Sequence, residues 1–313
     1  MKKCDQCQKF APNIHQPGGV LNPLSSPWPF AQWSLDIVGI FPKAAGNKRY
    51  LLVGTDYFTK WVEVEPLANI RDVDAKRFVW KNIVTRFGIP RTLISDNRLQ
   101  FDSKTFRRYC CDLGIINRYS TSAYPHGNGQ AEAINKVIVS RLKKRLDDAK
   151  EKWIEKLPLV LWTYQTTPRR STREMPFSMN YGAKAVIPLK IGFPTLRTSS
   201  FTPNSNDELL EKSLDLIEER RENAMVQFAY YQHKLKHGYD ANVKLRPLAP
   251  GDLVLRKVLG TAKNPAWGKL GPNWEGPYHI TSVAGIGAYY LEDLEEKAVP
   301  CPWNVNNLRK YYY

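Results

Sequence analysis

Cysteine is scarce in this chain, which has five among 313 residues, an odd number for a framework of paired disulfides. No apolar run is long enough for the core of a signal peptide or for a membrane-spanning helix. No internal repeat is evident either. We therefore expect a soluble chain in a reducing compartment, with no membrane partner.

Ligands for a zinc ion are also few. Cys4 and Cys7 have the C-x₂-C spacing of half a zinc site, but two further ligands are missing at the usual distance. His15 follows alone. We expect no stable zinc site.

Acidic residues are outnumbered, since 46 Lys and Arg face 30 Asp and Glu. The formal net charge is +16 and the pI is about 9.6. A chain of this charge attracts polyanions, although attraction alone carries no sequence specificity. The composition therefore favours a nucleic-acid partner.

Three carboxylates stand in informative surroundings. Asp36 lies in the apolar run QWSLDIVGIF, and Asp96 follows the short apolar stretch Thr92–Ile94 at the end of a predicted strand. Glu132 is separated from Asp96 by 35 residues and lies in the first turn of a predicted helix. The apolar stripe of this helix has helical spacing and comprises Ala131, Ile134, Ile138, Leu142 and Leu146.

Each acid also has an ordinary structural interpretation. Asp36 suits an edge strand, Asp96 a turn, and Glu132 the favourable end of a helix dipole. Taken singly, these interpretations are the better ones. Burying an unpaired carboxylate in the run around Asp36 is costly, however, and hard divalent cations prefer several converging carboxylates. Taken together, the three acids favour a metal site for phosphoryl transfer.

At this point the chain resembles a known family, the integrases of gypsy-type LTR retrotransposons and, more distantly, of retroviruses. The resemblance extends from Lys3 to Tyr278 and rests on the stretches KKCDQCQKFAP, WSLDIVGIFP, YLLVGTDYFTKWVEVEPL, GIPRTLISDN, STSAYPHGNGQAEAIN and GKLGPNWEGPYHI. It implies a ribonuclease-H-like core in which Asp36, Asp96 and Glu132 are the catalytic ligands of two Mg²⁺ or Mn²⁺ ions. It also implies DNA as substrate, a homo-oligomer when active, and action in the nucleus.

The resemblance implies DNA contacts as well. It makes Ser122–Gly129 the active-site loop, with Tyr124 and Asn128 near the scissile phosphate; an ordinary turn before a helix is the alternative. It also assigns a DNA contact to Lys136, one turn beyond Glu132. Lys143 is near the same face, in the segment RLKKR, which suits a solvated helix face as well as it suits DNA contact or nuclear targeting.

Two departures from the family pattern affect the predicted activity. The family has Gly after Asp-Asn, whereas this chain has Arg98, which can pair with Asp96 or hold a DNA phosphate. Cys4 and Cys7 match the end of a zinc module whose histidines lie upstream, so this reading frame is expected to start inside that module. These features motivate one alternative, a catalytically decayed or domesticated DNA-binding protein. A ribonuclease-H-like nuclease is another.

The predicted fold class is α/β: a ribonuclease-H-like mixed sheet flanked by helices, a helical spacer and a small C-terminal β-barrel. We expect a zinc-module remnant and linker at 1–28, the catalytic core at 29–188, a linker with a long helix at 189–248, and the barrel at 249–313. The core should run three antiparallel strands, helix, strand, helix, strand, helix. Predicted helices and strands include Asp72–Phe87, 151–165 with a kink at Pro158, Asp207–Lys236, Asp252–Val258, Tyr278–Val283 and Ala288–Asp293. Trp153 and Trp162 are assigned to packing rather than to base stacking.

Overall fold

The computed structural model describes residues 3–14, 18, 26–96, 99–120, 129–146, 150–183, 185, 202–244, 246–258, 271–285 and 287–313. The chain divides into two compact units. The larger, here called the core unit, comprises residues 24–119 and 128–233. The smaller includes the N-terminal segment and residues 234–313, and is called the C-terminal unit. The domain boundaries drawn from the sequence remain predictions.

The core unit is built on a five-stranded mixed sheet in the order β3-β2-β1-β4-β5. Its strands are β1 (Gln32–Val38), β2 (Tyr50–Asp56), β3 (Val62–Leu67), β4 (Thr92–Asp96) and β5 (Ile116–Ser120). The first three are antiparallel neighbours, whereas β4 runs parallel to β1. The predicted order of strands and helices is confirmed.

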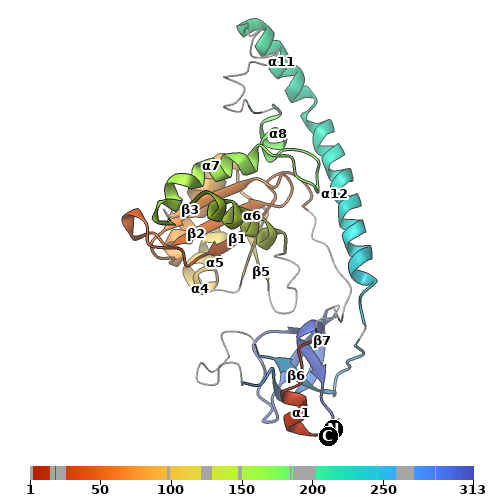
Figure 1. Cartoon of the computed structure of the whole chain (residues 1–313). Helices are drawn as coiled ribbons and strands as arrows, with labels where there is room; N and C mark the ends of the chain where they lie inside the picture. Colours follow the sequence, from red (N-terminus) through yellow and green to blue (C-terminus); the bar gives the residue numbers. More distant parts are fainter. Residues whose placement is uncertain are drawn as a thin grey trace. The chain divides into compact units, whose positions relative to one another are not determined.

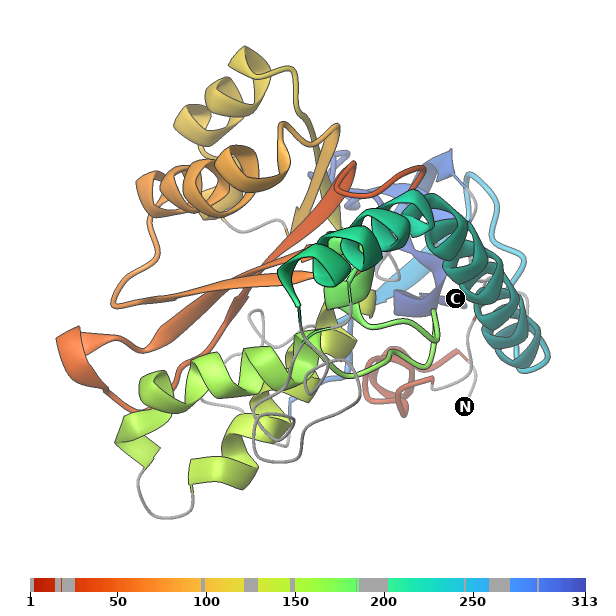
Figure 2. The ribbon, with the colours of Figure 1, turned by 90° about the horizontal axis from the view of Figure 1, so that it is seen from above.

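One face of this sheet is covered by the helices that follow β3 and β4 (Figure 2). These are α2 (Asp72–Phe78), η2 (Val79–Val84), α3 (Thr85–Phe87), α4 (Leu99–Asp102) and α5 (Lys104–Asp112). The packing is close: a Cβ on Gly54 of β2 would lie 3.0 Å from Cε1 of Phe78. The predicted helix Asp72–Phe87 is present as a run in which η2 has π-helical hydrogen bonding, and it stops at Gly88 with φ +86°.

The other face is covered by α6 (Gly129–Leu146) and α7 (Trp153–Gln165), with the short η4 (Lys150–Lys152) before α7 (Figure 1). Ile138 and Leu142 of α6 are buried, as the predicted stripe requires. Trp153 is fully buried, and its indole nitrogen donates to the carbonyl of Pro42 at 2.9 Å. Two helix layers thus enclose the sheet, and the predicted α/β fold class is confirmed.

Among the described residues, the helices after α7 are α8 (Pro176–Tyr181), α11 (Pro203–Asp215) and α12 (Ile217–Asp240). The predicted helix Asp207–Lys236 therefore begins earlier, with Pro203 in its first turn, and is interrupted at Leu216. Ala224 of α12 is buried in a cluster with Phe58 and Met179, and Phe228 of the same helix is buried as well. No helix among the described residues is both long and apolar enough to cross a membrane.

The C-terminal unit contains a five-stranded antiparallel sheet in the order β10-β6-β7-β8-β9. Its elements are α1 (Asp5–Lys9), β6 (Leu253–Lys257), β7 (Trp274–Gly285), β8 (Ala288–Glu292), β9 (Trp303–Asn304), η6 (Val305–Asn307) and β10 (Leu308–Lys310). Among the described strands, no pairing joins β9 to β10, so the expected barrel is an open sheet. The remaining short element, η1 (Ala45–Asn47), lies before β2 of the core.

The N-terminal segment packs against this C-terminal sheet. Gln8 is buried, donates to the carbonyl of Tyr312 at 2.7 Å and accepts from its backbone N–H at 2.9 Å. The indole nitrogen of buried Trp274 donates to the carbonyl of Ala11 at 3.0 Å. Residues from both ends of the chain therefore share one small hydrophobic core.

Candidate active site

Two of the three predicted acids stand side by side on neighbouring parallel strands. The register of β1 and β4 pairs Gln32 with Thr92 and continues to Leu35 with Ser95. Asp36 and Asp96 each come one residue further along. The next step of the register therefore brings them together, at the carboxyl end of β4.

Alternation along the strands gives both carboxylates the same face. Leu35 and Leu93 point into the cluster under α2 and α5, so Asp36 and Asp96 point to the opposite face, the one that α6 covers. Both acids are half-buried. A pair of carboxylates on one face is the start of a site for a cation.

Helix α6 brings the third acid to this face. The side-chain amide of Asn135, in α6, donates to Oδ2 of Asp36 at 2.6 Å, while the backbone N–H of Ile37 donates to Oδ1 at 2.7 Å. Glu132 lies three residues before Asn135, on a neighbouring position of the same helical surface, and is exposed. The Asn135 bond thus fixes the first turns of α6, and with them Glu132, beside β1.

Two residues of this site were missed in the sequence. Asn135 stands on the apolar stripe of α6 between Ala131 and Ile138, and a buried polar residue on such a stripe was an available signal. Tyr57 is buried just after β2; burial, and next the nearby charge of Asp36, raises the pKa of its phenol. The Tyr57 hydroxyl therefore remains protonated beside the acids. Its position had no local signature.

The chemistry of these side chains fits a hard divalent cation, because carboxylate oxygens and an amide are the ligands that Mg²⁺ and Mn²⁺ accept. The adjacent placement of Asp36 and Asp96 on one face agrees with that fit. Within the described ranges, however, no group of three His, Cys, Asp or Glu is close enough to hold a metal ion. Helix α6 brings Glu132 to the side of the sheet that carries Asp36, but Glu132 does not form a group of three ligands with Asp36 and Asp96.

Other predicted site residues have mixed outcomes. Lys136 and Lys143 are exposed on α6. Tyr124 and Asn128, as well as Arg98, lie outside the described residues. The DNA contacts assigned to them remain predictions.

The two N-terminal cysteines are exposed free thiols at the start of α1. A backbone hydrogen bond from Cys7 lowers the pKa of Cys4, and the side-chain bond with Cys4 raises that of Cys7. The two sulfurs are therefore neighbours.

Comparison with known proteins agrees with this geometry. Residues 27–125 match the family described as integrase core domain, and residues 248–312 match a domain of unknown function, DUF8803. The chain is 24% identical over 316 aligned residues to the Tf2-3, Tf2-4 and Tf2-5 transposon polyproteins of Schizosaccharomyces pombe. Those alignments cover 99% of this chain and 23% of each polyprotein, so it spans about a quarter of their length.

A solved structure extends the likeness to the fold. The simian T-cell lymphotropic virus intasome, in complex with the PP2A regulatory subunit B56 gamma, has a chain that matches with a TM-score of 0.59 at 15% identity. The match covers 100% of this chain and 88% of that one.

Family match, strand order and paired acids agree on one class: residues 27–125 match the integrase core domain, and the fold of the chain is similar to that of an intasome chain. The Tf2 polyproteins, to which it is similar along nearly its whole length, agree with the gypsy-type resemblance noted in the sequence. That resemblance is confirmed.

Proposed function

We propose that the chain is the integrase of a gypsy-type LTR retrotransposon, a polynucleotidyl transferase that inserts element DNA into target DNA. Water first trims the 3′ end of the element DNA. The freed 3′-hydroxyl then attacks a phosphodiester of the target, without a covalent enzyme intermediate. Such chemistry takes place in the nucleus, on DNA held by a homo-oligomer that handles two element ends.

The observation that carries this proposal is the convergence of Asp36, Asp96 and the Glu132 turn of α6 on one face of the sheet. Asp36 and Asp96 would hold one divalent ion, and Asp36 and Glu132 would hold the other. When bound, two Mg²⁺ or Mn²⁺ ions activate the attacking oxygen and neutralise the charge that develops on the phosphate. The zinc remnant at Cys4 and Cys7 takes no part.

The side chains of the chain do the positioning. Asn135 orients Asp36 through its amide, so that the carboxylate keeps one rotamer as substrate enters. Lys136 and Lys143, both exposed on α6, contact phosphates of the element end. Tyr124 and Asn128 are assigned to the scissile phosphate by the family resemblance.

A strand-transfer assay tests the proposal, with labelled duplex ends in Mg²⁺ or Mn²⁺. We expect Asp96→Asn to reduce joined product by more than about a hundredfold, since even residues that only support metal ligands change activity 10–100-fold. Asp112→Asn, an exposed acid at the end of α5, is the matched control and should retain activity. Equal activity in the Asp96→Asn variant would rule out the acidic-triad mechanism.

The form of the product separates the remaining alternatives. Cut but unjoined DNA would indicate a ribonuclease-H-like nuclease. Product that appears only in an Arg98→Gly variant would indicate a decayed enzyme whose remaining function is DNA binding.

A further inference from the structure

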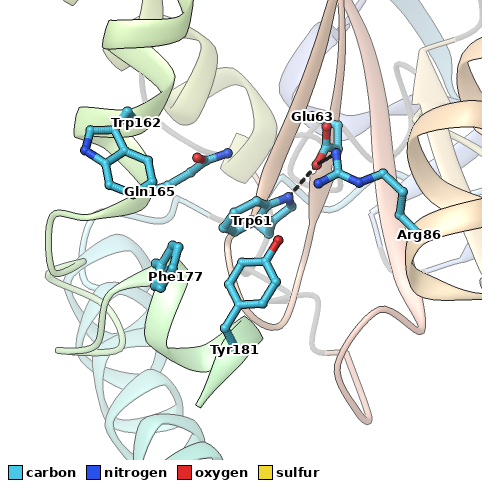
Figure 3. Close-up of a pocket in the computed structure, with 7 residues that line it drawn as sticks. All are labelled: Trp61, Glu63, Arg86, Trp162, Gln165, Phe177 and Tyr181. Carbon is cyan, nitrogen blue, oxygen red and sulfur yellow. Dashed lines mark hydrogen bonds and ion pairs between the residues drawn. The ribbon is translucent and has the colours of Figure 1, made fainter. Parts of the chain in front are cut away.

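Apart from the candidate active site, a pocket lies at the outer edge of the core sheet, along β3 (Figure 3). It plays no part in the proposed integrase chemistry. Strand β2 separates β3 from β1, which carries Asp36. The pocket has a volume of about 340 Å³, similar to that of a large side chain with its solvent. Its lining residues are Trp61, Glu63, Arg86, Trp162, Gln165, Phe177 and Tyr181.

Aromatic rings form most of its wall. The rings of Trp61 and Tyr181 meet edge to face at 5.6 Å, and Phe177 lies 4.8 Å from Tyr181. Trp162 meets Phe177 at 5.7 Å, which makes the wall continuous from β3 to α7 and α8. Trp61 is only 4% exposed, whereas Tyr181 is 44% exposed and stands at the rim. The faces of aromatic rings attract cations, and a flat cation can also stack on them.

A carboxylate stands at one end of the aromatic wall. Oε1 of Glu63 accepts from the indole nitrogen of Trp61 at 2.7 Å and pairs with Nη1 of Arg86 at 2.5 Å. Both bonds go to the same oxygen. Among the described residues, none bonds the second oxygen, Oε2, so it can accept from a ligand. The side chain is only 11% exposed, which strengthens any charge interaction that it makes.

Arg86 indicates which ligand suits this carboxylate. Its guanidinium already binds Glu63, but 42% of the Arg86 side chain is exposed, so Arg86 can move outward while the carboxylate stays nearly buried. A second guanidinium can therefore share Glu63 or displace Arg86. Trp162, which the sequence assigns to packing, packs on Phe177 of α8, and it is half-buried in the wall of this pocket.

We propose that this pocket binds the arginine side chain of a protein partner. The flat guanidinium stacks on the aromatic wall and donates to Oε2 of Glu63. This binding mode uses both the planar shape of the guanidinium and its fixed N–H donors. The neighbouring Glu65 on β3 already pairs with Arg77 at 3.5 Å and accepts from Asn82 at 3.1 Å, so Glu63 is the carboxylate that the pocket offers. A nucleotide suits the pocket less well, because its phosphate would approach this carboxylate.

Binding of small probes to the full chain tests this directly. N-acetyl-arginine amide is compared with N-acetyl-citrulline amide, which has the same shape without the charge. We expect the arginine probe to bind about tenfold more tightly, because a hydrogen bond between charged groups is stronger than one from a neutral donor. Binding should also shift the indole N–H resonance of Trp61. Equal affinity of the two probes, or an unmoved Trp61 resonance, would overturn the proposal.

Three variants add effects of opposite sign. Glu63→Gln should weaken binding of the arginine probe about tenfold, and Tyr181→Ala, at the exposed rim, should weaken it severalfold. Arg86→Ala should strengthen it, because the competing guanidinium is gone. If Glu63→Gln does not fold, as judged by thermal unfolding, Tyr181→Ala and Arg86→Ala still decide. The reverse pattern, with deoxyguanosine monophosphate bound more weakly by Arg86→Ala, would identify a nucleotide site instead.

Discussion

Asp56 and Asp36 are acids on paired strands, β2 and β1, but their surroundings are built in different ways. Asp56 is fully buried and accepts from the backbone N–H and the hydroxyl of Thr59, both at 2.7 Å, and from the N–H of Phe30. The cation of Lys60 is nearby. Asp36 is half-buried, and its described donors are the amides of Ile37 and of Asn135, 99 residues away.

The contrast separates a structural acid from a candidate functional one. Thr59, three residues after Asp56, supplies two of the donors to its carboxylate, so this acid is held largely within its own turn. Asp36 instead takes a donor from the helix that carries Glu132, so its contact joins β1 to the element that brings the third acid.

The largest effect is expected from neutralising the structural acid. Asp56→Asn replaces a buried carboxylate that accepts from Thr59 and Phe30, and weakening hydrogen bonds to a buried charged group costs about 3 kcal/mol. Urea unfolding measures the loss. Asp36→Asn is the matched control and should change the free energy of unfolding by less than about 1 kcal/mol. Equal losses of unfolding free energy in Asp56→Asn and Asp36→Asn would show that the two acids do not differ in their structural role.

The next effect is a pH dependence that Lys60 produces. Burial lowers its pKa to about 7, whereas the unfolded chain titrates near 10.4. Between these values the unfolded chain binds more protons, so stability rises with pH; the contribution is full above the unfolded pKa and is lost as pH falls through about 7.

The free energy of unfolding should therefore increase by on the order of 1–3 kcal/mol between pH 7 and pH 9. Urea unfolding at both pH values tests this, with Lys60→Met as the comparison, since the thioether can still pack on Phe228. A rise of the same size in Lys60→Met would assign it to other groups.

The smallest effect should come from the long-range donor to Asp36. Asn135→Ala removes the amide that orients the carboxylate, and we expect strand transfer to decrease about 10–100-fold, with a higher Mg²⁺ requirement. Ser140→Ala, exposed on the same helix, is the control. Unchanged activity and Mg²⁺ dependence in Asn135→Ala would show that Asp36 needs no such support.

The sequence was sufficient for features that depend on local patterns. Strand alternation and apolar stripes gave the order of elements, and the apolar surroundings of Asp36 and Asp96 marked them as unusual. Tyr57 and the pocket along β3 depend on which strands and helices meet, and no local pattern encodes that; Asn135 interrupts an apolar stripe, but its partner Asp36 lies 99 residues away. Lys60 is buried and has a positive φ of +62°, and lysine rarely shows either feature. Its place in the structure therefore follows from the packing around it.

The contacts between Gln8 and Tyr312 join residues 304 positions apart. Closing so long a loop costs more entropy than pairing the core strands, whose partners lie much closer together in the chain. The core unit can therefore fold before these contacts form. Helix α1 is then among the last elements to reach its place.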